Sequence, residues 1–437
     1  MDIGNHIQFV SDEEGIQLAE LTGQNSDQFS QKKKDFIGWI ANFATIKSGK
    51  TTDIYFKRTT QVLRAKGLDK THVVAEVTTG KLPRNWEWGV WSGVEEVAKL
   101  LEGLPIDVYC LPEGTIFKPK DAYGYRAPVM FIEGPCGVFT EMETPLLGLI
   151  CQSTGIATAS ARIKKIAWDK LCLSFGIRRM HPAISPVIDR AAYIGGMDGV
   201  SCVESAVRLG LTPMGTMPHA LIIVFGDQTK AWQAFDEVLP NEVPRIPIID
   251  TYSDEKAEAI LAAMALGDHL WGVRLDTPGS RRGNFVEIIK EVRWELDIRG
   301  YKHTKIFISG GIGEKEAEWL NIPEVDGFGI GTSISNSPVV DFALDIVEME
   351  GDPVAKRGKL GGKKEVWYCN TCFTERTTLW EAPAPKCSVC EQKMERALIP
   401  LIQQGVITAE LPDAQILRQQ VIDHLQALRT REGEGRP

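Results

Sequence analysis

The second half of the chain alternates short apolar runs with amphipathic segments, and this alternation constrains the fold more than any other feature. The runs LCLSF, LIIVFGD, IPIID, WGVRLD, KIFISGG and VDGFGIG are separated by helical patterns such as DEKAEAILAAMALG and FVEIIKEVRWELDIRG. Strands that alternate with helices pair in parallel through crossover helices. So many consecutive units favour a (β/α) barrel over an open sheet. The sequence therefore predicts an α/β fold with an irregular barrel.

The chain has 437 residues, which is too many for one simple core, so several domains are expected. Before the barrel, alternating apolar patterns and turn residues predict a sandwich-like α+β layer. Its expected strands cover residues 71–79, 106–117 and 127–135, and its expected helix covers 90–104. The predicted parts are an N-terminal extension (1–35), an α+β domain (36–135), the barrel (136–350) and a C-terminal segment (351–437).

Charge and hydropathy exclude several classes of protein. The formal net charge of −9 argues against charge-driven binding to nucleic acid or to anionic membranes. No apolar run reaches membrane-spanning length, and the N-terminus lacks the basic and apolar regions of a signal peptide. We therefore expect a cytoplasmic protein with neither a nucleic acid nor a membrane as partner.

Polar residues follow the predicted strands at the ends that a barrel gathers into one rim. Arg274 and Asp276 end one strand, Asp250 ends another, and Phe175 and Arg178 follow a third. Active sites of such barrels lie at the carboxyl ends of the strands. Glycine-rich turns after the last two strands let backbone N–H groups approach a phosphate. These turns contain Gly310, Gly311, Gly329, Gly331 and Thr332.

Two further groups of residues are open to more than one interpretation. His219 lies between a glycine-rich turn and an apolar run, where a structural histidine is at least as common as a catalytic one. Tyr55, Lys57 and Arg58 in TTDIYFKRTT combine an aromatic ring with cations, which suits a phosphate or pyrophosphate but equally suits a solvated helix face. Arg281 and Arg282, after the Pro-Gly turn, are candidates for phosphate contact or for surface charge.

An ordered set of short stretches resembles the nicotinate phosphoribosyltransferases of the type II phosphoribosyltransferase fold, which are close relatives of the nicotinamide enzymes. The resemblance covers about residues 50 to 350, in the stretches TDIYFKRT, VMFIEGP, LSFGIRRMHP, GGMDGVSCVESA, GTMPHAL, VRLDTPG, ISGGIGE and FGIGTSI. It implies an enzyme of NAD salvage that joins nicotinate to phosphoribosyl pyrophosphate and forms nicotinate mononucleotide and pyrophosphate. It also implies a homodimer or larger homo-oligomer with shared active sites.

The resemblance also implies roles for individual residues. Phe175 would stack on one face of the pyridine ring, and Tyr55 of a neighbouring subunit would cover the other. Arg178 and Arg274 would face the ring and the phosphates, and the glycine turns would take the 5′-phosphate. Asp276, with Asp250 on the same rim, would meet the ribose and Mg²⁺-bound pyrophosphate. His219 matches a histidine that some members phosphorylate with ATP, which couples hydrolysis to synthesis, as in a ligase.

Asp198 in GGMDGVS raises a question about the substrate. It aligns with an aspartate that meets the amide in the nicotinamide enzymes. A carboxylate at that position would repel the carboxylate of nicotinate unless an arginine offset it. The choice between acid and amide therefore stays open at this point, with the nicotinate branch preferred on the pattern of the whole chain.

The C-terminal segment contains two CxxC pairs about fifteen residues apart, a strong zinc-ribbon pattern within residues 365–395. Its ligands would be Cys369, Cys372, Cys387 and Cys390. Four thiolates leave no open position on the metal, which indicates a structural Zn²⁺ and not a catalytic one. The amphipathic pattern of residues 411–431 predicts a final helix.

Three alternatives to a nicotinate enzyme remain. Nicotinamide phosphoribosyltransferase and quinolinate phosphoribosyltransferase carry out related reactions, and the latter requires a more basic pocket because its substrate has two carboxylates. From a different class, the chain could be a zinc-ribbon binding or regulatory protein on an inactive barrel. Retention of Arg178, Asp276 and both glycine turns argues against that reading.

Overall fold

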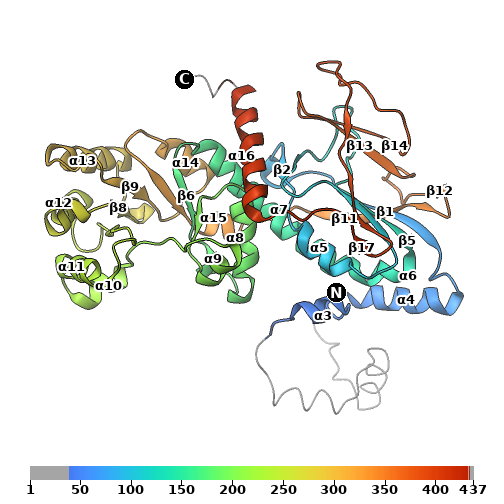
Figure 1. The fold of residues 1–437 in the computed structure, drawn as a ribbon, viewed down its shortest axis with the longest axis horizontal. Coiled ribbons are helices and arrows are strands. Elements are labelled where there is room, and N and C mark those ends of the chain that lie inside the picture. Colours follow the sequence, from blue (N-terminus) through green and yellow to red (C-terminus); the bar gives the residue numbers. More distant parts are fainter. Residues whose placement is uncertain (1–38, 432, 434–437) are drawn as a thin grey trace, which may run out of the picture. The chain divides into compact units, whose positions relative to one another are not determined.

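The computed structural model describes residues 39–431 and residue 433 (Figure 1). The predicted N-terminal extension, residues 1–35, lies outside these described residues. From Ile46 onward the chain forms one unit with two large hydrophobic cores, each associated with its own sheet.

The first sheet has seven antiparallel strands in the order β12-β11-β1-β5-β3-β16-β17. In that order their bounds are Asp352–Pro353, Phe342–Met349, His72–Thr79, Met130–Pro135, Asp107–Cys110, Ile399–Gln403 and Val406–Ile407. The strands expected from the alternating patterns at 71–79, 106–117 and 127–135 are confirmed, the second one in part, as β3 and the two-residue β4 (Ile116–Phe117). The helix expected within 90–104 is α5 (Val94–Leu101), and α4 (Ile54–Lys66) precedes β1.

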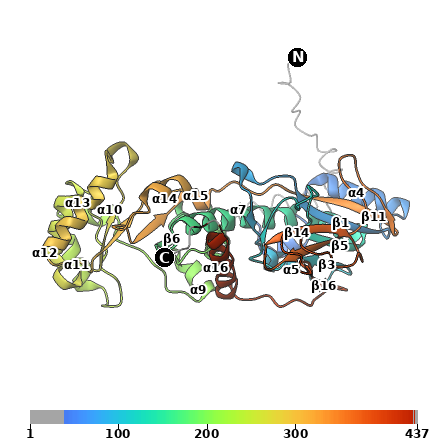
Figure 2. The same ribbon diagram turned by 90° about the horizontal axis from the view of Figure 1, so that it is seen from above.

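One long helix belongs to both cores. α7 (Glu143–Ile166) contributes Leu146 and Ile150 to the core of the antiparallel sheet and Ile156 and Ile163 to the core of the parallel sheet. It can do so because its small residues let neighbouring segments approach closely, and a Cβ added to Gly155 would lie 2.3 Å from the Pro338 carbonyl oxygen. Figure 2 shows α7 running between the strands of the two sheets.

The second sheet is parallel, as the strand–helix alternation predicted, with the order β7-β6-β10-β9-β8. Its strands are β7 (Gly199–Val200), β6 (Leu171–Ser174), β10 (Gly327–Ile330), β9 (Lys305–Ile308) and β8 (Gly272–Leu275). The helices that follow them include α9 (Val203–Leu209), α12 (Glu255–Leu266), α13 (Phe285–Ile298), α14 (Glu314–Leu320) and α15 (Thr332–Ser335).

The parallel strands do not form a complete barrel ladder among the described residues. Beyond β8, residues 245–249 pair with residues 270–274 through two isolated parallel bridges, Arg245–Leu270 and Ile248–Arg274, and form no named strand. Two single backbone hydrogen bonds connect this segment to β7 through residues 214–217. They run from Met217 N to the Ile246 oxygen (3.4 Å) and from Met214 N to the Val200 oxygen (2.9 Å). The regular part of the predicted barrel is thus a five-stranded sheet.

The helical content between β6 and β8 is larger than expected. The run LIIVFGD, which we counted among the strands, lies in α10 (His219–Phe225), so this prediction was wrong. Only Ile222 of that helix is fully buried, and the left-handed Gly226 ends it, so the apolar run is an exposed helix face. The helices α8 (Ser185–Ile194) and α11 (Gln228–Val238) were not expected from the sequence.

The C-terminal end of the expected barrel segment also differs. We assigned residues 136–350 to the barrel, but β11 (342–349) pairs with β1 in the antiparallel sheet. Phe342 and Val347 of this strand are both buried in the first core although they lie five residues apart. They can share a core because the pairing with β1 shifts register at Val347, between Ile346 and Glu348.

After β12 the chain builds a small sheet and then returns to both cores. The sheet consists of β13 (Lys364–Cys369), β14 (Thr374–Leu379) and β15 (Glu395–Arg396). The predicted final helix is confirmed as α16 (Ala414–Arg431), which packs on α7 and α8. None of the described helices is long and apolar enough to cross a membrane.

Candidate active site

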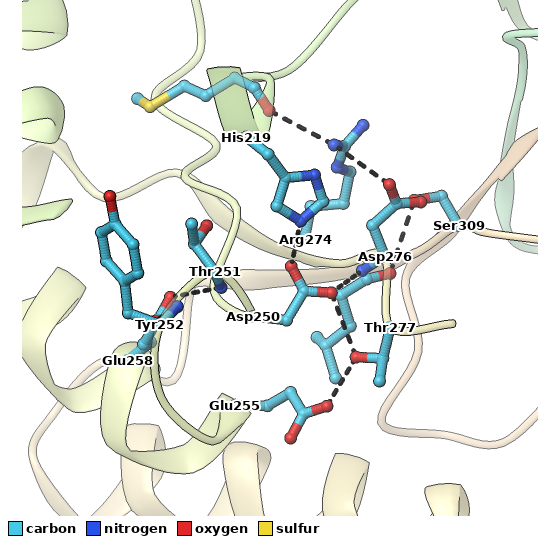
Figure 3. A network of polar contacts seen from close by, with 12 residues as sticks. His219, Asp250, Thr251, Tyr252, Glu255, Glu258, Arg274, Asp276, Thr277 and Ser309 are labelled. Carbon is cyan, nitrogen blue, oxygen red and sulfur yellow. Dashed lines mark hydrogen bonds and ion pairs between the residues drawn. The ribbon is translucent and has the colours of Figure 1, made fainter. Parts of the chain in front are cut away.

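Polar side chains gather at the carboxyl ends of the parallel strands (Figure 3). Asp250 follows residues 245–249, Arg274 and Asp276 stand in and after β8, and Ser309 follows β9. Parallel strands end at the same edge of a sheet, which brings these residues together. The structure therefore unites Asp250, Arg274 and Asp276 as the sequence predicted, and it adds His219.

Asp250 is the centre of this network. Its side chain is only 5% exposed, and Oδ1 lies 2.9 Å from His219 Nε2. Its Oδ2 accepts a hydrogen bond from Asp276 N at 2.7 Å and lies 3.1 Å from Thr277 Oγ1, which also lies 2.6 Å from Glu255 Oε1. Both carboxylate oxygens are thus engaged, so Asp250 links the start of α10 to the end of β8.

The loop after Asp250 is fixed by a buried carboxylate that the sequence did not single out. Glu258 of α12 is fully buried and accepts hydrogen bonds from the backbone N–H groups of Thr251 (3.2 Å), Tyr252 (2.7 Å) and Ser253 (2.7 Å). Asp254 caps the same helix by accepting a hydrogen bond from Ala257 N at 2.9 Å. The first turn of α12 therefore holds Asp250 on the rim.

Arg274 has donors that the protein leaves partly unused. One terminal nitrogen donates to the Met217 carbonyl oxygen at 3.3 Å and lies 3.8 Å from Asp276 Oδ2. Its Nε is buried and has no hydrogen-bond partner among the described residues. Burial lowers the pKa of Arg274, and the nearby charge of Arg178 acts in the same direction, while Asp276 and Asp250 oppose it. The guanidinium stays charged at neutral pH and is available to an anion.

Asp276 is held at one oxygen and less constrained at the other. Ser309 Oγ donates to Oδ1 at 2.6 Å, whereas the nearest charged group to Oδ2 among the described residues is a terminal nitrogen of Arg274 at 3.8 Å. A carboxylate oriented in this way presents Oδ2 to a ligand on the rim.

The glycines of the two expected phosphate turns have different roles. Gly310 and Gly311 have φ values of +81° and +76°, a left-handed pair that other residues rarely adopt. A Cβ added to Gly329, in contrast, would lie 2.6 Å from Phe175 Cδ2. Gly329 therefore makes room for the Phe175 ring, and its place inside β10 does not suit a phosphate loop. Gly331 and Thr332 stand at the turn into α15.

Arg282 has a structural position under the first glycine turn, whereas no contact recorded for Arg281 involves its side chain. The Arg282 guanidinium donates to the carbonyl oxygens of Thr277 (2.8 Å), Ser309 (3.1 Å) and Gly310. It is buried and lies over the Phe285 ring at 4.9 Å. Arg282 thus braces the turn through its backbone.

Asp198 is not on this rim, which corrects its expected place beside the substrate. It precedes β7, at the opposite end of the strand, where it pairs with Lys164 (2.9 Å) and Arg418 (2.5 Å). It also accepts a hydrogen bond from Cys172 N at 2.8 Å. The residues that follow β7 on the rim side are Ser201 and Cys202. The direction of the strand could have indicated this from the sequence. In GGMDGVSC, Asp198 comes before the strand, and the polar residues that follow it are Ser201 and Cys202.

Tyr55, Lys57 and Arg58 lie together on α4, and no described hydrogen bond or ion pair connects them to the rim of the same chain. Tyr55 is 55% exposed and Arg58 is also exposed. Lys57 pairs with Glu141 at 2.5 Å, and Thr144 Oγ1 lies 3.2 Å from both Asp53 N and Asp53 Oδ2. The start of α4 is therefore fixed to the start of α7.

A basic pocket of about 640 Å³ lies on the antiparallel-sheet part of the protein. Its cationic lining residues are Lys81, Arg126, Lys356 and Lys359, and its acidic lining residue is Asp341. Lys356 and Lys359 also pair with Asp345 at 2.5 and 2.6 Å. The sequence analysis did not single out this pocket, although two of its lysines lie in the lysine-rich stretch at 351–366.

Glu143, at the start of α7, connects this pocket with Tyr55 electrostatically. Burial raises the pKa of Glu143 to about 7, Asp345 adds to the shift, and Lys356 opposes it. The pKa of the Tyr55 phenol is raised by desolvation and then by the charges of Glu143 and Asp53. Tyr55 and the basic pocket thus belong to one region of the chain.

The four predicted metal ligands converge. The sulfur atoms of Cys369, Cys372, Cys387 and Cys390 all lie within 4.8 Å of one another. Backbone N–H groups of Cys372 and Val389 donate to the sulfurs of Cys369 and Cys387 at 3.3 and 3.4 Å. The hydroxyl of Thr374, followed by backbone N–H groups, lowers the pKa of Cys387 to about 6. Four sulfurs at this spacing, with N–H donors to stabilise thiolates, fit a closed tetrahedral metal site.

The end of α16 contacts the first cysteine knuckle. Arg431 donates to the carbonyl oxygens of Thr371 and Cys372, and its guanidinium lies 4.7 Å from the centre of the Phe373 ring. Phe373 also meets the ring of His424 edge to face, with the centroids 6.0 Å apart. The knuckle is thereby connected to a helix whose Leu417, Val421 and Leu425 lie in the core of the parallel sheet.

An antiparallel layer followed by parallel strands with this acidic and basic rim defines the type II phosphoribosyltransferase class. The family models named quinolinate phosphoribosyl transferase, N-terminal domain and C-terminal domain match residues 53–154 and 156–345. The chain is 52% identical to the nicotinate-nucleotide pyrophosphorylase of Pyrococcus furiosus, and the match covers 90% of this chain and 99% of that one with a TM-score of 0.86. The chain therefore belongs to this family of phosphoribosyltransferases, as the sequence resemblance indicated.

Two further relatives bear the name of the nicotinate enzyme. The nicotinate phosphoribosyltransferase pncB1 of Mycobacterium tuberculosis is 26% identical over 374 residues, which cover 77% of this chain and 81% of that protein. Human nicotinic acid phosphoribosyltransferase has a TM-score of 0.68 at 20% identity, covers 85% of this chain and 92% of its own, and shares the fold.

Proposed function

We propose that this protein is a nicotinate phosphoribosyltransferase, which forms nicotinate mononucleotide and pyrophosphate from nicotinate and phosphoribosyl pyrophosphate in NAD salvage. The observation that carries the proposal is Arg274, whose guanidinium is mostly buried and whose Nε has no hydrogen-bond partner among the described residues, next to Asp276 and within electrostatic reach of Arg178. This combination suits phosphoribosyl pyrophosphate. The arginines suit its anionic phosphates, and Asp276 suits the positive charge that develops on its ribose. The nicotinate enzymes among the relatives support the choice of substrate.

In this proposal Phe175 and Arg178 bind the pyridine ring and its carboxylate. Phe175 is only partly buried and its ring lies on Gly329, so one face is supported by the sheet. Arg178 is exposed three residues further along, in the short turn Ile177–Arg179. An aromatic face and a guanidinium from one turn can orient a flat anion.

Displacement at the anomeric carbon develops positive charge on the ribose and negative charge on the leaving pyrophosphate. Asp276 Oδ2, next to the rim, stabilises the ribose side, and Arg274 stabilises the phosphate side. No protein nucleophile is required. Mg²⁺ bound with the pyrophosphate would neutralise further charge there, and Asp276 Oδ2, which forms no hydrogen bond among the described residues, would be available to hold it.

His219 is proposed to carry a phosphoryl group from ATP. Asp250 Oδ1 lies against Nε2 at 2.9 Å, which favours a proton on Nε2 and leaves Nδ1 unprotonated as the acceptor. Asp250 Oδ2 also accepts a hydrogen bond from Asp276 N. Phosphorylation of His219 would therefore shift Asp250 and, through it, the position of Asp276 at the ribose side of the site.

The complete site is proposed to form between two copies of the chain. Tyr55, Arg58 and the basic pocket lie in one region that has no described polar contact with the rim of its own chain. In a dimer, this region of one subunit would supply Tyr55 to the pyridine ring and lysines to the pyrophosphate of the other. Mixing inactive Arg274→Ala with inactive Tyr55→Ala subunits should restore part of the activity if sites are shared, and should restore none if each chain is self-sufficient.

The cysteine cluster is proposed to bind one structural Zn²⁺. Its four sulfurs leave no position for a substrate, and the segment supplies tertiary contacts instead of rim residues. The alternative of a zinc-ribbon binding or regulatory protein requires an inactive rim. The retained Arg178, Arg274 and Asp276 argue that the rim is active.

Nicotinamide and quinolinate remain the competing substrates. With Asp198 neutralised by Lys164 and Arg418 at the far end of β7, the rim loses the carboxylate that could have favoured the amide. Quinolinate has support from the names of the matching family models, and its second carboxylate would need a further cation.

The test is pyrophosphate release by the purified protein with phosphoribosyl pyrophosphate, Mg²⁺ and each of the three pyridines, with and without ATP. Of the three pyridines, only nicotinate is expected to give turnover, and Asp276→Ala is the inactive control. Release of CO₂ with quinolinate would identify the decarboxylating enzyme. Turnover with nicotinamide only, or with none of the three, would overturn the proposal.

A further inference from the structure

The structure buries a carboxyl group directly behind the turn that carries Phe175 and Arg178. Asp189 of α8 is 0% exposed, and Ser174 Oγ donates a hydrogen bond to its Oδ1 at 2.8 Å. Its Oδ2 has no hydrogen-bond partner among the described residues. The reaction proposed above uses none of these atoms, so the group needs another explanation.

An isolated buried carboxyl is costly, and its surroundings offer little compensation. Burial raises the pKa of Asp189, and two hydroxyls act against this shift: that of Ser174, which donates to Oδ1, and that of Ser205, which is near the carboxyl but forms no hydrogen bond among the described residues. Among the other buried residues of α8, Ile188, Ala191, Ala192 and Ile194 are apolar, and Ser185 and Tyr193 carry a hydroxyl but no positive charge. An apolar side chain at position 189 would bury no unsatisfied oxygen, so a packing role alone does not account for an aspartate.

Ser174 shows what the carboxyl can do. It is the last residue of β6 and immediately precedes Phe175. Its carbonyl oxygen accepts from Ser201 N at 3.2 Å and from Ser201 Oγ at 2.9 Å, which joins the ends of β6 and β7. With its hydroxyl on Asp189, Ser174 is fixed to two strands and to a helix behind them.

The turn beyond Ser174 is held on its other side as well. Phe175 N donates to the Ile330 oxygen of β10 at 2.8 Å. Gly176 packs so closely on the turn after β10 that an added Cβ would lie 2.6 Å from the Gly331 oxygen. The Asp189–Ser174 hydrogen bond links α8 to the residue that precedes this turn, and the turn itself also packs on Ser335 of α15.

We propose that Asp189 is a positioning residue for the pyridine-ring subsite, which through Ser174 fixes the strand end from which Phe175 and Arg178 project. This inference rests on the proposed function for the identity of the ring. It predicts that the hydrogen-bonded geometry of Asp189, and not its charge, controls binding of the pyridine substrate.

The test compares Asp189→Leu, Asp189→Asn and Ser174→Ala with the wild type in steady-state kinetics. Asp189→Leu should raise the KM for nicotinate about tenfold, the size expected for one lost hydrogen bond, and change the KM for phosphoribosyl pyrophosphate less than about twofold. Asp189→Asn keeps an oxygen acceptor for Ser174 and should stay within about threefold of the wild type. Ser174→Ala should match Asp189→Leu, and the double variant should be no worse than either single one.

A matched control and a second measurement separate positioning from general damage. Ser160→Ala removes a buried hydroxyl of α7 that, unlike that of Ser174, has no hydrogen-bond partner among the described residues, and it should leave both KM values unchanged. Hydrogen exchange should rise in residues 174–179 of folded Asp189→Leu and stay unchanged in residues 305–312. This readout does not depend on turnover, so it remains decisive if the wild type proves inactive with nicotinate and the proposed function fails.

Three results would overturn the inference. The first is an unchanged nicotinate KM with unchanged exchange in Asp189→Leu. The second is an equal rise of both KM values. The third is an Asp189→Asn variant as impaired as Asp189→Leu, which would assign the effect to charge.

Discussion

His219 and Asp250 share a single hydrogen bond, from ring nitrogen Nε2 to Oδ1 over 2.9 Å, although they belong to different segments 31 residues apart. The second oxygen of the same carboxylate accepts the backbone N–H of Asp276 at 2.7 Å. The histidine at the start of α10 is therefore separated from the end of β8 by one carboxylate. A phosphoryl group placed on that histidine would act on the strand that carries Arg274 and Asp276.

His219→Gln should separate ATP coupling from synthesis. Glutamine keeps a donor near Asp250 but cannot accept a phosphoryl group, so ATP should no longer stimulate turnover, while ATP-independent turnover stays within about fivefold of the wild type. Pyrophosphate release with and without ATP measures both effects. Nuclear magnetic resonance of the wild type with ATP should detect phosphohistidine at Nδ1. Persistent stimulation by ATP in the variant would remove His219 from the coupling.

Asp276→Asn should lower kcat/KM by about 10²–10³, since a lost charge contact in the transition state costs about 3–4 kcal/mol. The amide can still accept from Ser309 Oγ, so the fold of the turn should persist and the melting temperature should change little. Asp297→Asn is the matched control, because that residue forms a peripheral pair with Arg293 within α13. Equal activities of the two variants would contradict a role for Asp276 at the ribose.

Glu143 should make stability depend on pH. Its pKa is raised from 4.5 to about 7, mainly by burial, so the unfolded chain releases this proton at a lower pH than the folded protein does. Its contribution to the free energy of unfolding is therefore full below about pH 4.5, is lost as the pH rises to 7, and is constant above that. Thermal melts from pH 4.5 to 8 should show Glu143→Gln gaining on the wild type over this interval.

The exposed Glu102 provides the control for this pH dependence. Its side chain is 42% exposed in a pair with Lys99. Glu102→Gln should therefore follow the wild-type pH profile. A parallel profile for Glu143→Gln would show that the Glu143 carboxyl titrates in its ordinary range.

Removal of metal from the cysteine cluster should loosen α16. The carbonyl oxygens of Thr371 and Cys372 hold Arg431, so a disordered knuckle releases the end of the helix. Hydrogen exchange within residues 414–431 should increase after a thiol reagent and a chelator have removed the metal. Arg431→Ala should give the same increase with an unchanged zinc content by elemental analysis. Arg299→Ala, which breaks only a local pair with Glu295, should change neither quantity.

The sequence predicted most of the rim because strand ends are marked by local signals. Asp250, Arg274 and Asp276 each follow a short apolar run, and parallel pairing makes such positions adjacent. Asp198 was placed beside the substrate by the family resemblance and not by a strand end. It precedes the two-residue β7, and so short a strand gives little indication in the sequence of where it begins. Gly329 was misjudged because its neighbour, the Phe175 ring, is distant in sequence.

Other parts of the site depend on contacts that no local pattern encodes. Glu258 looks like an ordinary charged residue of an amphipathic helix, yet it is buried against three backbone N–H groups. The basic pocket combines residues from 78 to 359, so its charge becomes visible only after β1 and β11 pair. The run at 221–227 was read as a strand because apolar content alone does not distinguish a strand from an exposed helix face.

The sharing of α7 between the two cores has a consequence for how the protein unfolds. Residues near its start pack with the antiparallel sheet and residues near its end pack with the parallel one, along 24 residues or about 36 Å of continuous helix. Loss of either core would strip one half of this helix of its partners and weaken the other half. The two sheets should therefore melt in one cooperative calorimetric transition, like a single folding unit, despite their separate architectures.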